Sequence, residues 1–182
     1  MMTVTLMMHK VLLSLGSNLN FRKKNIERAV KHLNSSRYIN FIDISSLYET
    51  SPMYNSNQQD FINCVLEIQT SLSPLELLKY VQTIEKKMGR NRNLRRNQPR
   101  KIDIDILTYN DEIVDRENLK IPHPEIGERK FVLIPLFEIK GNISIPGYSE
   151  KIEDLIKNLD SNSDKIRKCN YRINEKNISY SS

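Results

Sequence analysis

The chain has 182 residues, of which 38% are hydrophobic and 27% are charged, and its formal net charge at pH 7 is +6. This length and composition are typical of one globular domain and exclude a disordered chain. The excess of positive charge favours an anionic partner, which could be nucleic acid, a membrane surface or a nucleotide.

The cysteine content and the hydropathy of the sequence indicate the cellular location of the protein. Cys64 lies in a strand-like run and Cys169 in a polar tail, so the sequence predicts neither a disulfide framework nor a zinc site. No segment approaches the roughly 20 apolar residues that are needed to span a bilayer. We therefore expect a cytoplasmic protein with no membrane partner. One domain is expected over residues 1–182, with 1–8 as an extension and 161–182 as a flexible tail.

The first predicted elements are a strand and a helix. Val11–Leu15 is an apolar run that ends at Gly16, which indicates a buried strand entering a tight turn. Gly16 could instead let a ligand approach the backbone, although a turn glycine is the simpler interpretation. A helix is predicted from about Asn20 to residues 34–36, because apolar residues recur there on one helical face.

Two strands and a polar loop come next. Tyr38–Tyr48 is rich in β-branched and aromatic residues and predicts one long strand. Thr50–Asp60 is rich in Asn and Gln and predicts a long polar loop. Phe61–Thr70 predicts the next strand, with alternate residues on its two faces.

The segment from Ser73 to Met88 carries the clearest helix signals in the chain. Ser73 is a favourable N-cap, Pro74 suits the first helical position, and Glu76 completes a capping box. The basic segment that follows, Arg90–Arg100, has little apolar content and is predicted to be a loop.

The strand after this loop carries the candidate metal site. In Arg100–Leu107, Asp103 and Asp105 share one face, and three isoleucines share the other. Adjacent carboxylates repel each other, and Mg²⁺ is the usual remedy because hard divalent cations prefer oxygen ligands. Residues 86–101 hold eight lysines or arginines and no acidic residue. Carboxylates beside guanidinium groups are typical of nucleotide-using phosphoryl transfer. The alternative is a half-buried strand whose outer aspartates only face water.

His123 stands between Pro122 and Pro124. The two prolines restrict the backbone on either side and hold the histidine in a defined, extended place. A rigid turn that needs no chemistry from the imidazole is the simpler interpretation of a lone histidine.

The remaining elements complete the fold prediction. Asn110-Asp111 predicts a hairpin turn before a short return strand at Glu112–Val114. Phe131–Ile139 is either a short helix or an edge segment, and Ser149 caps a final helix. The order strand, helix, strand, strand, helix, strand predicts an α+β fold with a ferredoxin-like βαββαβ core. We expect a mostly antiparallel sheet with helices on one face, and an extra C-terminal hairpin and helix.

From about Val11 to Leu159 the chain resembles one family, the 6-hydroxymethyl-7,8-dihydropterin pyrophosphokinases of folate biosynthesis. The matching segments, in order, are Leu15–Leu19, Ser46–Thr50, Phe61–Asn63, Gly89–Arg92, Pro99–Ile106, Pro122–Pro124 and Arg129–Leu136. The resemblance implies transfer of the β,γ-diphosphate of ATP to the pterin hydroxymethyl group, with release of AMP. It also implies two small-molecule substrates, no nucleic acid, and a monomer.

The resemblance assigns roles to residues of this chain. Two Mg²⁺ ions would be held by Asp103 and Asp105, and the implied catalytic arginines are Arg90 and Arg100. The implied ATP-binding residues are Leu78, Gln82, Glu85, Arg92, Arg96, Arg100, Ile106, His123 and Arg129. The implied pterin-binding residues are Thr50, Pro52, Met53, Phe61, Asn63 and Phe131.

These assignments have plainer alternatives. A single arginine of the basic loop could be a solvated charge. Gln82 and Glu85 could lie on an ordinary wet helix face, and Phe131 could be plain core. By contrast, the resemblance turns His123 from a structural residue into a candidate phosphate ligand.

The sequence departs from the family pattern in three segments. Asn97-Gln98 replaces a Trp-Gly or small-residue pair, Ser51 replaces a proline, and Pro124 stands where some members carry tyrosine. None of them alters the carboxylates, so we expect an active enzyme.

Two other functions are compatible with parts of the sequence. A nucleic-acid-binding module would use the basic charge and a ferredoxin-like sheet, but the chain lacks the aromatic-rich RNP signature. Such a module would also have no use for Asp103 and Asp105, which repel phosphate without a metal. An inactive homologue would be missing a metal or phosphate residue, and none is missing.

Overall fold

The computed structural model describes residues 7–52, 58–90, 99–159 and 165–173. Its elements, in chain order, are β1 (His9–Ser17), α1 (Arg22–Asn34), β2 (Ile39–Ile44), β3 (Tyr48–Thr50), β4 (Phe61–Thr70), α2 (Pro74–Lys87), β5 (Asp103–Tyr109), β6 (Val114–Arg116), β7 (Leu119–Ile121), a 3-10 turn at Ile126–Glu128, α3 (Lys130–Lys140), α4 (Ile152–Asn158) and β8 (Ile166–Lys168).

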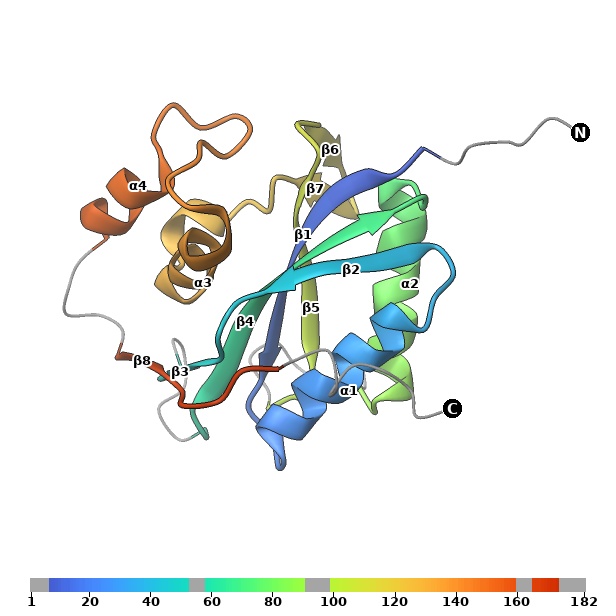
Figure 1. Cartoon of the computed structure of the whole chain (residues 1–182), viewed down its shortest axis with the longest axis vertical. Coiled ribbons are helices and arrows are strands. Elements are labelled where there is room, and N and C mark those ends of the chain that lie inside the picture. The colour runs from blue at the N-terminus through green and yellow to red at the C-terminus, as the bar shows by residue number, and fades with distance from the viewer. Residues whose placement is uncertain (1–6, 53–57, 91–98, 160–164, 174–182) are drawn as a thin grey trace, which may run out of the picture.

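One antiparallel sheet organises these elements (Figure 1). β1 lies between β4 and β5, and β4 pairs on its other side with β2 and β3. α1 links β1 to β2, and α2 links β4 to β5. This is the ferredoxin-like βαββαβ arrangement, so the predicted fold is confirmed. β6 and β7 form a separate hairpin, which replaces the predicted return strand at Glu112–Val114.

Two hydrophobic cores lie on opposite faces of the sheet. Alternating side chains of β1 separate them, since Leu13 and Leu15 pack with α1 and α2 whereas Leu12 packs with α3 and α4. Figure 1 shows α3 and α4 on the other side of the sheet from α1 and α2. The prediction of helices on one face therefore holds for α1 and α2 but missed the second layer. Of the two alternatives for Phe131–Ile139, the helix is correct.

The α2 helix begins as its sequence predicts. Glu76 accepts hydrogen bonds from the backbone N–H of Ser73 (2.9 Å) and from the Ser73 hydroxyl (2.6 Å). Pro74 is the first helical residue. Leu77, Val81 and Ile84 form the buried stripe of this helix.

The predicted strand Tyr38–Tyr48 is interrupted by serines. The Ser45 hydroxyl accepts the backbone N–H of Val65 (3.0 Å), which takes the place of a main-chain acceptor. Ser46 donates its backbone N–H (2.9 Å) and its hydroxyl (2.7 Å) to Glu138 on α3. The backbone therefore leaves the sheet between β2 and β3, and the prediction of one long strand is wrong.

The C-terminal segment is more ordered than its composition predicts. Residues 166–168 form β8, which extends the sheet beyond β3, and Ile173 is only 2% exposed. These contacts place residues 165–173 against the sheet and the core, and a flexible tail over 161–182 stays a prediction. The rest of that range lies outside the described residues.

We expect Glu138→Gln to destabilise the fold in a pH-dependent way. Burial opposes ionisation of Glu138, but hydrogen bonds from Lys168, Ser46 and Tyr48 outweigh it and hold its pKa below the ordinary value of 4.5. The charged form therefore stabilises the fold above pH 4.5, and this contribution is lost as the pH falls through the folded-state pKa. At pH 7 the free energy of unfolding should fall by about 1–3 kcal/mol.

Urea unfolding across a pH series measures this effect. The difference between the two proteins should shrink steadily below pH 4.5. A difference that does not change with pH would contradict the assignment of Glu138 as a charged anchor.

Candidate active site

The candidate site lies at the end of the sheet where β1 ends and where β4 and β5 begin. Gly16 pairs with Asn63 on β4 and with Asp103 on β5. Residues directly opposite each other in a sheet project from the same face. Because neighbouring strands are about 4.8 Å apart, Asn63 and Asp103 are separated by roughly 10 Å across Gly16. The register therefore brings a predicted pterin residue and a predicted metal ligand to one surface.

Asp103 lies between two arginines. Its Oδ1 accepts a hydrogen bond from Arg90 Nη1 (2.5 Å), and its Oδ2 accepts one from Arg100 Nη1 (2.7 Å). The structure thus brings together both predicted catalytic arginines and one predicted metal ligand. Asp103 does not merely face water, as the plainer alternative proposed.

Asp105 is less well compensated. The Arg129 guanidinium is 3.9 Å from its carboxylate, which is beyond hydrogen-bonding distance. Burial and the neighbouring Asp103 carboxylate raise the pKa of Asp105 above its ordinary value, and Arg129 only partly opposes them. A carboxylate in this position favours either a proton or an added cation.

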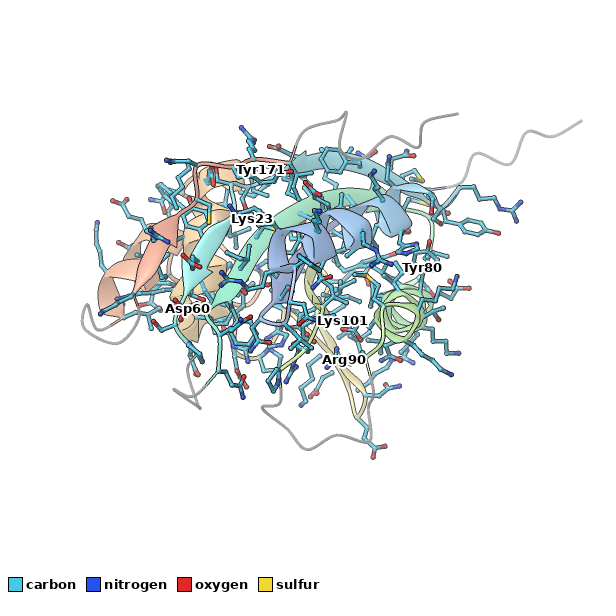
Figure 2. The ribbon with its side chains drawn as sticks, turned by 90° about the horizontal axis from the view of Figure 1, so that it is seen from below. Lys23, Asp60, Tyr80, Arg90, Lys101 and Tyr171 are labelled. Atoms are coloured by element: carbon cyan, nitrogen blue, oxygen red, sulfur yellow. The ribbon has the colours of Figure 1, made fainter. Side chains whose placement is uncertain are left out.

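Glu85 reaches the same group from the end of α2. Its side chain is 2% exposed, it accepts the backbone N–H of Ile104 (2.9 Å), and it forms an ion pair with Arg90. The wet helix face is therefore the wrong interpretation of Glu85. Figure 2 shows Arg90 between the end of α2 and the start of β5. Glu85 attaches α2 to the edge of β5 and orients Arg90 toward Asp103.

Asn18 is a site residue that sequence reasoning missed. The side-chain Oδ1 of Asn18 accepts a hydrogen bond from the backbone N–H of Arg100 (2.8 Å), and the backbone N–H of Asn18 donates to the Arg100 carbonyl (3.2 Å). Its Nδ2 donates to Gln58 Oε1 (2.8 Å), close to β4. Asn18 thus positions Arg100 and links it to Gln58, in the segment just before β4. The only signal was its place in the matching segment Leu15–Leu19.

Gly16 lies within β1, so the interpretation as a turn glycine is wrong. A Cβ added at Gly16 would be 2.8 Å from Oδ1 of Asn63. Its missing side chain makes room for the Asn63 amide.

His123 and Arg129 lie beside the carboxylates. The backbone N–H of His123 donates to the Leu107 carbonyl on β5 (2.9 Å). Burial and Arg129 lower the pKa of His123, so the imidazole is neutral near pH 7. The N–H of Glu125 donates to Nδ1 of His123 (3.2 Å), so the hydrogen of the neutral ring lies on Nε2. The buried Nε of Arg129 has no hydrogen-bond partner among the described residues.

The predicted pterin residues form a second group. Asn63 Nδ2 donates to Thr50 Oγ1 (2.8 Å), and Thr50 pairs with Phe61 across β3 and β4. Pro52 is half-buried just after β3. Phe131 is partly buried at the start of α3, where it packs against the second core and lies 5.6 Å from the Arg129 guanidinium. Phe131 is thus in part a core residue.

Three other predicted ATP-binding residues lie on the side of the sheet that α1 and α2 cover. Ile106 is 4% exposed and belongs to the core on the α1 and α2 side, opposite the carboxylates. Leu78 packs against the same core, and Gln82 is half-buried on α2. The positions that lie outside the described residues are Met53, Arg92, Arg96, Asn97 and Gln98.

The carboxylates of Asp103 and Asp105 could bind Mg²⁺ together with phosphate oxygens of a substrate. In the part of the chain that the structure describes, no group of three or more Asp, Glu, His or Cys residues could hold a metal. Mg²⁺ is commonly bound by one or two carboxylates plus substrate phosphates, which supply the remaining oxygens. Asp103 and Asp105 match this pattern.

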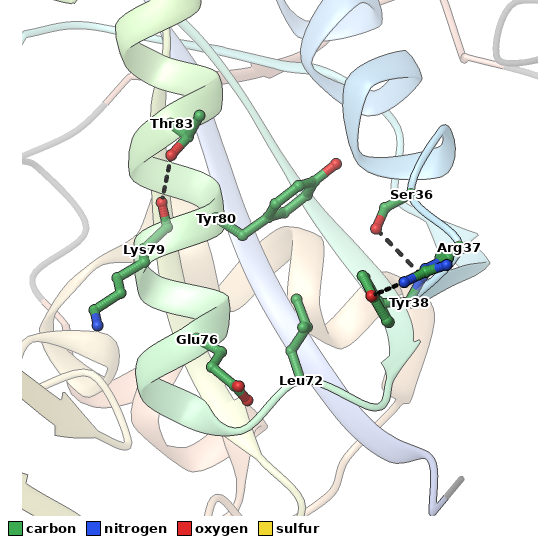
Figure 3. A pocket seen from close by; sticks show the side chains of 8 residues that line it. All are labelled: Ser36, Arg37, Tyr38, Leu72, Glu76, Lys79, Tyr80 and Thr83. Atoms are coloured by element: carbon green, nitrogen blue, oxygen red, sulfur yellow. Dashed lines mark hydrogen bonds between the residues drawn. The ribbon is translucent and has the colours of Figure 1, made fainter.

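A groove at the other end of the molecule lacks a pair of carboxylates that could bind a metal (Figure 3). It lies where β4 ends and α2 begins, and its single carboxylate, Glu76, is bonded to Ser73. The groove is lined by Ser36, Arg37, Tyr38, Leu72, Glu76, Lys79, Tyr80 and Thr83. The carboxylate and arginine cluster is thus the candidate active site.

A carboxylate pair beside several arginines is typical of the class of phosphoryl-transfer enzymes. Within that class, residues 12–141 match the model of the 7,8-dihydro-6-hydroxymethylpterin-pyrophosphokinase family. The chain belongs to this family, as its sequence predicted. This assignment displaces the nucleic-acid-binding alternative.

Individual relatives agree with the family assignment. The 2-amino-4-hydroxy-6-hydroxymethyldihydropteridine pyrophosphokinase of Haemophilus influenzae is 41% identical over 145 residues, which cover 80% of this chain and 89% of the relative. The enzyme of that name from Bacillus subtilis is 43% identical over 127 residues, or 70% and 75% of the two chains. The folic acid synthesis protein fol1 of Pneumocystis carinii is 44% identical over 151 residues, but this chain spans only 20% of its length.

A solved structure shares the fold. The Plasmodium falciparum HPPK-DHPS structure superposes with a TM-score of 0.65 at 18% identity, over 83% of this chain and 42% of that one. Among the described residues, no helix is long and apolar enough to cross a membrane.

We expect Glu85→Ala to lower the free energy of unfolding by about 1–3 kcal/mol, because the N–H of Ile104 loses its acceptor. Glu85→Gln keeps an acceptor oxygen and should cost less. Lys86→Ala, on the exposed face of the same helix, serves as the control and should change stability by no more than about 0.5 kcal/mol. Equal effects of Glu85→Ala and Lys86→Ala in urea unfolding would refute this role.

Proposed function

We propose that the chain transfers the β,γ-diphosphate of ATP to the hydroxymethyl group of 6-hydroxymethyl-7,8-dihydropterin and releases AMP. Membership of the pyrophosphokinase family supports this reaction. The observation that carries the proposal is the single sheet face that holds Asp103 and Asp105 a short distance from Asn63.

The pterin would bind at the β3 and β4 side of the site. The Asn63 amide offers both donors and acceptors for the edge of a flat ring, and its orientation is held by Thr50 and by the space at Gly16. Phe61 and Phe131 would stack on the ring faces. Pro52 and Met53 would complete the contacts.

The diphosphate would lie over β5. The hydroxymethyl oxygen attacks the β-phosphorus and loses its proton, a new O–P bond forms, and the bond between the β-phosphorus and the α,β-bridging oxygen breaks as AMP leaves. Such a transfer depends mainly on positioning and on stabilisation of negative charge. Arg100, Arg129 and the Nε2–H of His123 supply donors for phosphate oxygens. Arg90, held by Glu85, would act beside Asp103 during transfer.

Two Mg²⁺ ions would be held by Asp103 and Asp105 and would neutralise charge on the phosphates. The nucleotide side would also include Leu78, Gln82, Arg92, Arg96 and Ile106. We further propose that the enzyme acts as a monomer in the cytoplasm, with no nucleic acid partner.

We expect Asp103→Ala and Asp105→Ala each to lower pterin-dependent AMP release by at least about 100-fold while the protein stays folded. Each substitution removes a carboxylate from the metal-binding face. Asp115→Ala is the matched control, because Asp115 is 78% exposed on the β6–β7 hairpin, where it pairs with Lys120. Near-normal turnover in either site variant, with circular dichroism unchanged, would eliminate the metal-site assignment.

A further inference from the structure

The C-terminal segment Lys165–Ile173 lies beyond residues 12–141, which the family model matches. β8 pairs antiparallel with β3, and the N–H of Cys169 donates to the Leu47 carbonyl (2.8 Å). Ile173 is buried in the first core, and Tyr171 lies beside Lys23 of α1 (Figure 2), with 5.4 Å between the ammonium and the ring centre. The segment is thus attached to the sheet, to the core and to α1.

One of the two edges of β3 is paired with this segment. β3 is only three residues long, and it lies between β4 and β8. Thr50, its last residue, pairs with Phe61 on one side and with Ile166 on the other. Thr50 also accepts the hydrogen bond that orients Asn63. A short strand with an unpaired edge is weakly held. We therefore expect β8 to hold Thr50 in place and, through the hydrogen bond from Asn63 to Thr50, to hold the Asn63 amide in its orientation.

Ion pairs reinforce this arrangement. Glu49 of β3 pairs with Arg167, directly opposite on β8, and with Arg22 of α1 (2.9 Å). Arg22 also donates to the Asp60 carbonyl just before Phe61 (2.6 Å). The hydrogen bond from Arg167 is the largest influence that lowers the pKa of Glu49. Arg167, Glu49 and Arg22 thus connect the C-terminal segment to the start of β4.

We propose that residues 166–173 of this segment, which make its contacts with β3, the core and α1, are a positioning element for the pterin side of the active site, acting through β3 on Thr50 and Asn63. This inference rests on the proposed function, because it assumes that the pterin binds at those residues. The segment lies far from the phosphate side, where Arg100 is positioned by Asn18 instead. Its loss should therefore affect one substrate and not the other.

Arg167→Glu tests this inference without endangering the fold, since the Arg167 side chain is 80% exposed. The change sets a carboxylate directly opposite Glu49, where like charges weaken the strand pair. We expect the KM for the pterin to rise about fivefold, equivalent to about 1 kcal/mol. The KM for ATP and kcat should stay within about twofold, a margin well below that fivefold change.

Two variants complete the design. Arg167→Lys keeps the charge and should restore a KM for the pterin close to that of the wild type. Lys165→Glu makes the same change of charge at an exposed position before β8 and should leave both KM values unchanged.

Three results would overturn the inference. They are an unchanged pterin KM in Arg167→Glu, an equal rise in both KM values, or the same effect from Lys165→Glu. If the wild-type protein releases no AMP, the proposed function fails, and the inference that rests on it fails too. If the wild-type protein is active but one of the three results above is found, only the inference fails.

Discussion

Repulsion between Asp103 and Asp105 is the constraint on which the active end of this molecule depends. Two carboxylates on one face of a strand are unfavourable unless positive charge lies nearby. Arg90 and Arg100 compensate Asp103 directly, whereas Asp105 has only a distant contact with Arg129. The site is therefore incompletely neutralised in the protein alone. In the proposed function, a magnesium-bound triphosphate would supply both a cation for Asp105 and an anion for the donors of Arg129 and His123.

The fold holds this unfavourable arrangement in place from several directions. The opposite face of β5 is buried against α1 and α2, and Glu85 bonds the outer edge of the strand at Ile104. Asn18 fixes the backbone of Arg100 just before the strand begins. These contacts come from three different elements, and all of them are buried or half-buried. Packing and hydrogen bonds from several elements thus hold the two carboxylates together.

Local patterns in the sequence predicted the fold well. Alternation at Asp103 and Asp105 and the capping box at Ser73 are short-range signals, and the structure has both features. The break after β2 could not be found in the same way, because it depends on Glu138, which lies 92 residues from Ser46. The pairing of β8 with β3 is similarly non-local. Asn18 and Gly16 act through partners on other strands, so their roles depend on a register that periodicity alone does not reveal.

³¹P NMR of the wild-type protein with ATP, Mg²⁺ and 6-hydroxymethyl-7,8-dihydropterin would distinguish transfer of a diphosphate from transfer of a single phosphate. We expect AMP and a pterin diphosphate as the only products, formed only when the pterin is present. Formation of ADP and a pterin monophosphate would contradict this expectation, because the attack would then have occurred at the γ-phosphorus.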